Sequence, residues 1–438
     1  MLRCRATHPA LVFVVAAVSL LAMSAARKAG TPTSMENPAW LAVVPRPPAS
    51  LDIIRVRVIR GGTGVEIRGQ AIRAIGAWRA VDLGDHVTIR NADGRIIADA
   101  AGVEIDLGKA RTGVIRFVST SHLVLDGMRI GASAMLSDRE TGGFDVVAPL
   151  PIDTYIAGVL MAELYRGWPA ETYLAQAVAA RSYAAHERAL ARLARRGWDI
   201  DADTTRQAFR GLHDDPVAWN AARATRSLML TQHGQTLRAY YSSTCGGRSA
   251  SARDNWNTGS GREFNAAPAL QGAPDECPCR ASPRYRWERR TTPDILTARL
   301  SAWGKRHGRP IAELTELRAI EMTAANPWGR PTRYAVHDVT GVYELTAEEL
   351  RLASNMRLPN LSGDAPLHGA LAFSTDLDCE ILDDVVIIRG RGFGHGVGLC
   401  QFGAREYARQ GLHWPQILER YYPGADLVVA RPGRARQD

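Results

Sequence analysis

Residues 149–184 read PLPIDTYIAGVLMAELYRGWPAETYLAQAVAARSYA, and in this segment the pattern of the chain changes from short strands to helices. Pro151 suits the first position of a helix, because the N–H that proline lacks would be unpaired there. Glu163 lies on the same helical face as four apolar residues, which are Ile152, Ile156, Val159 and Leu160. A second helix, rich in alanine, is predicted to begin at Pro169 and to run to about Arg196.

Upstream of this segment, residues 51–148 have the pattern of an all-β region. Short runs that alternate or stay apolar are separated by turns that contain glycine. We expect strands at residues 52–59, 64–68, 86–90, 102–106, 113–118 and 122–127. No cluster of polar side chains in this region suggests chemistry.

Downstream, strands return at Gln235–Thr244 and Val385–Arg389, and a short helix is expected at Leu399–Gln410 after a Gly-rich loop. Residues 254–331 are rich in proline and arginine and are expected to be the least regular part. The whole pattern predicts an α+β fold. It has a β-rich N-terminal region, a central helical lobe that carries Glu163, and a C-terminal β region with the Gly-rich loop.

The two ends of the chain differ from the predicted core. Residues 1–26 have the layout of a secretory signal or an N-terminal anchor, with arginines, an apolar run at Ala10–Met23 and small residues after it. A Pro-rich linker is predicted at residues 27–50 and a tail at residues 431–438, so that the core domain covers residues 149–430. We therefore expect an exported protein of the periplasm or cell envelope.

The composition excludes several classes of protein. Of 438 residues, 46% are hydrophobic and 23% are charged, which is typical of a globular chain and excludes disorder or a coiled coil as the main architecture. Lys plus Arg number 54 and Asp plus Glu number 45, giving a net charge of +9. This excess is spread along the chain without a dense basic stripe, so nucleic acid is not expected as a partner.

Glu163 is the residue whose position most favours chemistry. A carboxyl group on an apolar helical face either faces a cleft or is buried, and burial raises its pKa by disfavouring the charged form. A general acid that works near neutral pH needs such a raised pKa. The alternative is a structural glutamate paired with Arg181 of the second helix. For Gln176 and Arg181, helix packing around a buried ion pair and ligand binding are equal alternatives.

The segment IRGRGFGHGVGLCQFGA, residues 388–404, carries glycine at alternate positions. These glycines let the backbone approach another backbone or a ligand closely, and they leave His395 as the solitary polar group of a narrow wall. Neither phosphate-binding glycine motif occurs there. Tyr240 and Tyr241 alternate along a predicted strand, so one ring can face a sugar while the other packs.

Four cysteines near polar turns are candidates for a metal site, namely Cys245, Cys277, Cys279 and Cys400. Three thiolates and an imidazole would form a tetrahedral zinc site. Disulfide pairing fits an exported protein equally well. No other cofactor is predicted. A nucleophilic role for Cys245 with a nearby histidine is a third interpretation.

Three segments together resemble the SpoIID/LytB domain family of exported bacterial cell-wall proteins. They are the helical segment at residues 149–184, RAYYSSTCGGRSASARDNW at residues 238–256, and GRGFGHGVGLCQFGAREYARQG at residues 390–411 followed by WPQILERYYPGADL. DIDADTTRQAFRG at residues 199–211 and LTAEELRLASN at residues 345–355 add to the resemblance. It extends from about Leu51 to Val429.

The resemblance implies either a lytic transglycosylase or an enhancer of a partner amidase. Enzymes of the family cut peptidoglycan glycan strands between N-acetylmuramic acid and N-acetylglucosamine, and they favour strands stripped of stem peptides. The family's catalytic glutamate corresponds to Glu163, its helical Gln and Arg to Gln176 and Arg181, and its G-H-G-V-G loop to Gly394–Gly398.

The chain departs from the family pattern in two places. Family members often carry Cys and His in the D-x-x-x-T-T-x-Q segment, where a structural zinc can bind, but this chain has Ala202 and Arg206 there. A zinc site is therefore not expected in that segment. Asp153 replaces a glutamate at the start of the first helix, which keeps a negative charge in the first turn.

We therefore expect a lytic transglycosylase in which Glu163 acts first as general acid and then as base. Attack by the muramic 6-hydroxyl group gives a 1,6-anhydro product and removes the need for a second carboxylate, which the matching motifs lack. Tyr241, His395 and Gln401 would line the sugar cleft. Arg181 would hold the muramic carboxylate or tune Glu163.

Two alternatives stay open. The first is a non-catalytic module that binds glycan and enhances a cell-wall amidase. The second is a cysteine-dependent peptidase that uses Cys245 or Cys400 with His395.

Overall fold

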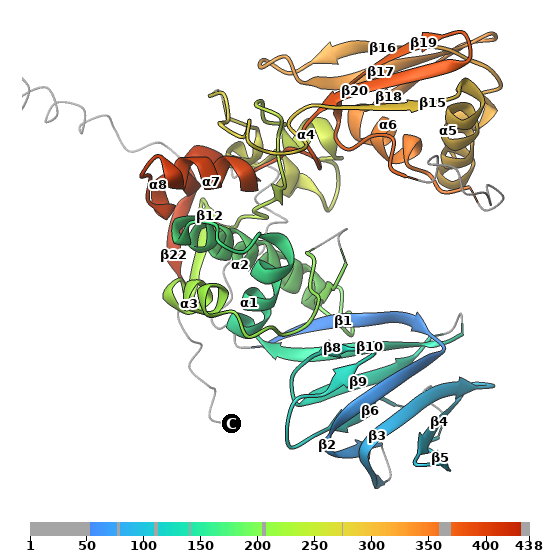
Figure 1. Cartoon of the computed structure of the whole chain (residues 1–438), viewed down its shortest axis with the longest axis vertical. Coiled ribbons are helices and arrows are strands. Elements are labelled where there is room, and N and C mark those ends of the chain that lie inside the picture. Colours follow the sequence, from blue (N-terminus) through green and yellow to red (C-terminus); the bar gives the residue numbers. More distant parts are fainter. Residues whose placement is uncertain are drawn as a thin grey trace, which may run out of the picture. The chain divides into compact units, whose positions relative to one another are not determined.

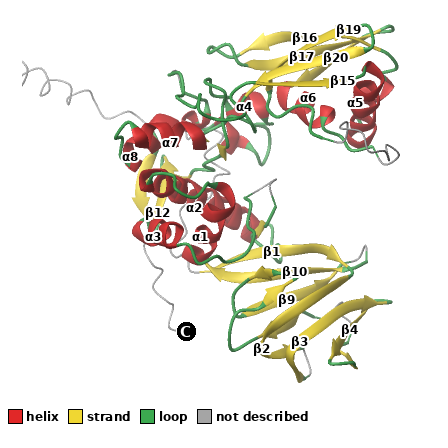
Figure 2. Ribbon diagram, in the orientation of Figure 1, coloured by secondary structure: helices red, strands yellow, loops and turns green. Residues whose placement is uncertain are grey.

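The computed structural model describes residues 53–76, 79–108, 113–139, 142–203, 207–273, 275–358 and 369–430 (Figure 1). The expected signal segment, the Pro-rich linker and the C-terminal tail lie outside these residues. Within the described ranges, no helix is long and apolar enough to span a bilayer. Helices and sheets are combined as an α+β fold (Figure 2).

The β-rich region precedes the first helix, as expected. Its described strands are β1 (Ile53–Gly62), β2 (Gly64–Ile75), β3 (Ala80–Ala92), β4 (Arg95–Ala100), β5 (Val103–Asp106), β6 (Ile115–Val118), β7 (Val124–Leu125), β8 (Met128–Arg129), β9 (Ser133–Asp138) and β10 (Phe144–Pro151). The order β1-β10-β9-β6-β2-β3-β4-β5 is antiparallel throughout, and β11 (Ile200–Asp201) pairs parallel with β1 at the edge.

Four strands of this region, β4, β8, β9 and β10, lie outside the ranges expected from the sequence. β4 and β9 both contain Ala and Asp, which have low strand propensity. Each strand lies between two others, β4 between β3 and β5 and β9 between β6 and β10, and the neighbours supply its backbone hydrogen bonds. Tertiary pairing therefore outweighs local preference at these positions.

The helical lobe forms where the sequence predicts it. It contains α1 (Ile152–Glu163), α2 (Ala170–Leu193) and α3 (Pro216–Ala224), which contact one another (Figure 2). Pro151 and Pro169 are extended residues immediately before the two helices. Each helix therefore begins one residue later than expected. The second helix ends before the predicted Arg196, because Arg195 adopts a positive φ of 52°. The apolar face expected for the first helix is buried.

Shorter elements complete this lobe. They are β12 (Leu228–Gln232), β13 (Gln235–Thr236), β14 (Tyr241–Ser242), α4 (Ala252–Asn255), two 3-10 turns (Glu263–Ala266 and Pro268–Leu270), β21 (Leu399–Cys400), α7 (Gln401–Arg409), α8 (Trp414–Tyr421) and β22 (Asp426–Val429). The prediction of one strand over Gln235–Thr244 is wrong. The chain turns where the Ala239 N–H donates to the Leu237 carbonyl at 2.9 Å, and β14 then pairs with β21 instead of β12.

A second hydrophobic cluster lies within residues 287–388, where irregular structure was expected up to residue 331. Its elements are β15 (Trp287–Thr291), α5 (Pro293–His307), a 3-10 turn (Pro310–Glu313), β16 (Leu317–Ala325), β17 (Pro331–Asp338), β18 (Val342–Thr346), α6 (Ala347–Ser354), β19 (Asp376–Leu382) and β20 (Val385–Arg391). Burial of Leu296, Leu300 and Trp303 on α5 holds that helix in place despite the many charged residues. The prediction for residues 254–331 is therefore wrong over much of its length.

Candidate active site

A cavity of about 710 Å³ brings together four of the residues singled out in the sequence. Glu163, Tyr241, His395 and Gln401 all line it. They come from the end of α1, from β14, from the Gly-rich loop and from the first position of α7. The carboxyl group that the sequence places on an apolar face therefore has an opening beside it.

Glu163 is half-buried and is the last residue of α1. Its Oε1 accepts a hydrogen bond from the Ala208 backbone N–H at 3.0 Å, and its Oε2 accepts one from Gln401 Nε2 at 3.2 Å. Both donors belong to segments far from Glu163 in sequence. The carboxyl group is therefore fixed in orientation while one side of it stays open to the cavity.

Burial raises the pKa of Glu163 above its usual range. The hydrogen bonds from Ala208 and Gln401, the positive charge of Arg210 and the phenol of Tyr241 act in the opposite direction on this pKa. The C-terminal end of a helix also disfavours a negative charge. Desolvation dominates, so Glu163 keeps its proton to higher pH than an exposed glutamate does. The donors Ala208 and Gln401 are in place to stabilise the carboxylate that forms when the proton leaves.

Two glycines of the loop allow it to form the wall of the cavity. Gly396 has a φ of 75°, and a Cβ atom there would meet Arg330 Nη2 at 2.6 Å. A Cβ atom at Gly398, with a φ of 67°, would collide with the carbonyl oxygen of Tyr240. The close backbone approach expected from the alternate glycines is thus present at these positions.

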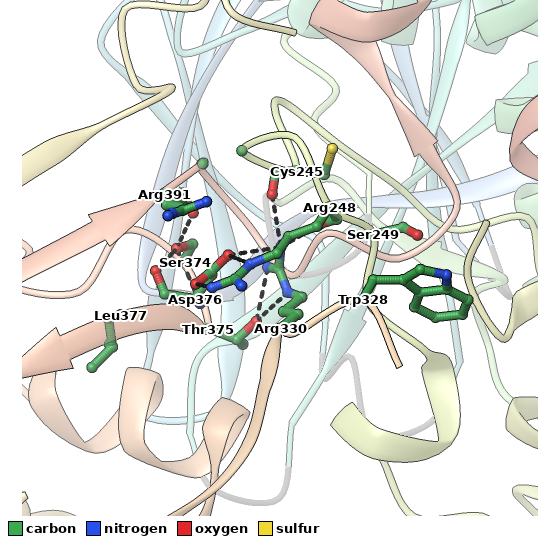
Figure 3. A network of polar contacts seen from close by, with 12 residues as sticks. Cys245, Arg248, Ser249, Trp328, Arg330, Ser374, Thr375, Asp376, Leu377 and Arg391 are labelled. Carbon is green, nitrogen blue, oxygen red and sulfur yellow. Dashed lines mark hydrogen bonds and ion pairs between the residues drawn. The ribbon is translucent and has the colours of Figure 1, made fainter. Parts of the chain in front are cut away.

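Arg330 ties the loop to its surroundings through a network of polar contacts (Figure 3). Its side chain is 1% exposed, and Nη1 donates to the carbonyls of Cys245 at 2.7 Å and Arg248 at 2.9 Å. Nη2 donates to Thr375 Oγ1 at 2.9 Å and to the carbonyl of His395 at 3.4 Å. One buried guanidinium therefore joins the turn after β14, the segment before β19 and the Gly-rich loop.

His395 is neutral in this setting. Its Nδ1 accepts a hydrogen bond from the Val397 backbone N–H at 3.0 Å, so the proton of the ring is on Nε2. Burial, together with the charges of Arg351 and Arg330, lowers the pKa of His395 to about 3. The ring also lies edge-on to Trp256, with centroids 5.0 Å apart. His395 can therefore offer its Nε2–H as a hydrogen-bond donor, while its lowered pKa disfavours the protonated ring.

The structure places Gln176 and Arg181 away from the cavity, contrary to the expectation that they contact substrate. Both side chains are fully buried between helices. Arg181 pairs with Asp153, Nη2 to Oδ1 at 3.0 Å, and donates to the carbonyls of Ala222 and Thr225, both at 2.8 Å. It does not pair with Glu163. The alanine-rich surface of α2 lets the helices approach closely, and this close packing encloses both polar side chains.

A second carboxylate, which the sequence reasoning missed, lines the same cavity. Glu187 of α2 is 3% exposed and forms an ion pair with Arg238 Nη2 at 2.7 Å. The guanidinium of Arg238 in turn lies over the rings of Tyr183 and Tyr240. Glu187 is thereby compensated by a fixed charge. No sequence signal separates it from the other charged residues near the end of α2.

Aromatic side chains on the cavity wall were also missed. Trp256 stacks on Tyr240 with centroids 4.2 Å apart, and Phe393 is 46% exposed. Flat exposed rings of this kind suit the apolar faces of sugars. The signal was present, because Trp256 ends the segment at residues 238–256 and Phe393 lies between two loop glycines.

Arginines give the cavity a positive character. Arg210 and Arg262 are exposed on its wall, and neither forms an ion pair with a carboxylate among the described residues. A site with unpaired guanidinium groups favours an anionic ligand.

The candidate cysteines lie together and away from this wall. Cys245, Cys277, Cys279 and Cys400 are buried, and no described cysteine forms a disulfide. Their Sγ atoms lie within 4.8 Å of one another, without a histidine among them. Among the described residues, neither Cys245 nor Cys400 forms a hydrogen bond with His395, so the geometry gives the cysteine-peptidase interpretation no support. Arg206, one of the two positions that depart from the family's zinc segment, lies outside the described residues.

Comparisons with known proteins match part of this chain to a known family. Residues 140–232, which include α1 and α2, match the family model described as stage II sporulation protein. The chain is 27% identical over 338 residues to an uncharacterized protein of Brachyspira hyodysenteriae, covering 76% of this chain and 81% of that protein.

Two further relatives carry functional names. The amidase enhancer of Bacillus subtilis is 25% identical over 298 residues, which cover 62% of this chain and 40% of that protein. The stage II sporulation protein D of Bacillus amyloliquefaciens is 23% identical over 303 residues, covering 65% and 76%. These matches support the assignment of this chain to the SpoIID/LytB family.

Proposed function

We propose that this protein is an exported lytic transglycosylase that cuts the glycan strands of peptidoglycan. The family match and the similarity to an amidase enhancer support a role connected with the cell wall. The observation that carries the finer proposal is a carboxyl group with a raised pKa on the wall of an open cavity lined by aromatic rings and arginines.

The proposed reaction uses Glu163 twice. In its protonated form it gives a proton to the glycosidic oxygen while the bond from that oxygen to C1 of N-acetylmuramic acid breaks. The resulting carboxylate is stabilised by the N–H groups of Ala208 and Gln401. It then takes the proton of the muramic 6-hydroxyl group as that oxygen bonds to C1. The ring closes to the 1,6-anhydro sugar, Glu163 regains its proton, and no water is consumed.

The charge of the cavity supports a peptide-free substrate. A muramic acid without its stem peptide exposes a lactyl carboxylate, which is a negative charge on alternate sugars of the strand. Arg210 and Arg262 can meet such carboxylates because neither is paired with a described acidic residue. Arg181 was expected to fill this role, but its burial leaves it to the arginines of the cavity wall.

Glu187 raises the question of ordinary hydrolysis, which uses a second carboxylate to activate water. Its carboxylate is engaged in an ion pair with Arg238, Nη2 to Oε1 at 2.7 Å. Since its side chain is also buried, Glu187 is poorly placed to hold a water molecule. We therefore assign Glu187 to positioning Arg238 and its aromatic neighbours.

A non-catalytic enhancer of an amidase is the second candidate, because one relative carries that name. The same cavity could hold a glycan strand and present it to a partner enzyme. The two functions differ in their dependence on the Glu163 proton, since binding requires the shape and charge of the wall but no proton transfer.

The test is product analysis by mass spectrometry after incubation of peptide-free glycan strands with purified protein. We compare wild type with Glu163→Gln, Glu187→Gln and the control Glu419→Gln, which changes an exposed glutamate of α8. The proposal predicts 1,6-anhydro ends from wild type, Glu187→Gln and the control, and none above background from Glu163→Gln.

Other outcomes would contradict the proposal in distinct ways. Reducing ends that disappear in Glu187→Gln would indicate a hydrolase. Wild type that releases no sugar ends but stimulates an amidase as well as Glu163→Gln does would indicate a non-catalytic amidase enhancer.

A further inference from the structure

Four thiol groups from three separate segments meet at one point, outside the residues that line the cavity. Cys245 lies in the turn after β14, Cys277 and Cys279 in a loop, and Cys400 at the start of α7. Each is at most 5% exposed. Their four Sγ atoms lie within 4.8 Å of one another.

This arrangement matches a tetrahedron of thiolates better than it matches disulfides. With metal–sulfur bonds of about 2.3 Å, neighbouring sulfurs of a tetrahedral zinc site lie about 3.8 Å apart. The Sγ atoms of Cys245 and Cys279 are 3.8 Å apart. Two disulfides would need two pairs in contact and would leave the pairs apart from each other, whereas here every Sγ atom is near all three others.

Hydrogen-bond donors around the sulfurs support negatively charged ligands. Cys400 Sγ accepts from the backbone N–H groups of Cys245 at 3.4 Å and Gly403 at 3.3 Å. The hydroxyl group of Tyr421 lies 3.3 Å from Cys277 Sγ. Donors of this kind stabilise metal-bound thiolates and fix the orientation of the ligands.

We propose that Cys245, Cys277, Cys279 and Cys400 bind one structural zinc ion. Four protein ligands leave no open position for water or substrate, so the ion has no direct part in bond cleavage. The site is not in the segment around Ala202, where the family resemblance places a zinc. It also differs from the sequence expectation, because a fourth thiolate replaces the imidazole.

The ion would hold the cavity wall in place. Cys400 is followed directly by Gln401, which donates to Glu163. The carbonyl oxygen of Cys245 accepts from Arg330, while its sulfur points away from that network (Figure 3). Zinc would thus link the turn after β14 to the start of α7, two segments that both line the cavity. Gln401 and Tyr241 would be positioned through it.

The first experiment measures metal content on the full chain without any glycan, so its result is independent of the proposed enzymatic function. Elemental analysis of wild type purified in the presence of zinc and a reductant should give one zinc per chain. The double variant Cys277→Ser/Cys279→Ser should lose it. The matched control is Cys379→Ser, which removes a cysteine of β19 outside the cluster and should keep one zinc per chain.

A second measurement covers the case in which the double variant fails to fold. Alkylation of the native wild-type protein, followed by mass spectrometry, should show the four thiols protected with zinc and modified after a strong chelator is added. The chelator should also lower the unfolding temperature of wild type. Three results would each overturn the proposal. They are disulfides among these four cysteines, wild type that contains no zinc, and a double variant that contains as much zinc as wild type, which would mark the metal as an adventitious ion only.

Discussion

Replacement of Glu163 by Gln should abolish catalysis. The variant should also become more stable than wild type as the pH rises, because only wild type loses stability with increasing pH. The two side chains have nearly the same shape. An amide oxygen can still accept from the Ala208 N–H, and rotation of the Gln401 amide restores the other contact. The structural cost is therefore at most about 1 kcal/mol, the net value of one neutral hydrogen bond.

The direction of the stability change follows from the raised pKa of Glu163. The folded chain keeps this proton over a pH range in which the unfolded chain, with an ordinary glutamate pKa of about 4.3, has lost it. The stability of wild type therefore falls as the pH rises through that range, and it stays lower above it. Glutamine carries no charge in either state, so the variant lacks this loss.

The loss of activity should be large. Removal of a positioned general acid lowers the rate by about 100- to 10,000-fold, which corresponds to about 3–5 kcal/mol in the activation barrier. In wild type, the rate should fall as the pH rises above the raised pKa of Glu163, because the acid form is then lost.

Two assays on the same protein preparations test this reasoning. Release of anhydro-sugar ends from peptide-free glycan gives the activity, and chemical denaturation from about pH 4 to pH 8 gives the free energy of unfolding. A difference in stability between variant and wild type that does not grow with pH would show that burial does not hold the Glu163 proton. Activity within a few-fold of wild type would refute its role as the acid.

Three further substitutions probe the surroundings of the site. Gln401→Leu removes a donor to the Glu163 carboxylate and so raises the pKa of Glu163 further, which should move the fall in activity to higher pH. An unchanged pH–rate profile would contradict this contact. Arg330→Leu leaves two buried acceptors, the Cys245 carbonyl and Thr375 Oγ1, without this donor and should cost about 2 kcal/mol or more in the free energy of unfolding. Arg318→Leu removes only an exposed ion pair and should cost about 1 kcal/mol or less. Arg181→Leu should lower the unfolding midpoint without changing KM for glycan, and a higher KM with normal stability would show that Arg181 contacts substrate.

The sequence by itself determined the local features of this protein. Alternation at residues 51–148 marks the β-rich region, and the change to helical spacing at Pro151 marks the first helix. Both are read from neighbouring residues, because strand and helix periodicities are set within a few positions of the chain. The same local pattern placed Glu163 on an apolar face.

Only the tertiary structure decided which side chains meet. Gln401 reaches Glu163 across 238 residues, and the Cys245 N–H reaches Cys400 across 155. The burial of Arg181 depends on where α3 packs, and the pairing of Glu187 depends on the turn that carries Arg238. No periodicity records these contacts, because they arise from the path of the whole backbone and from the burial that this path imposes on each charge.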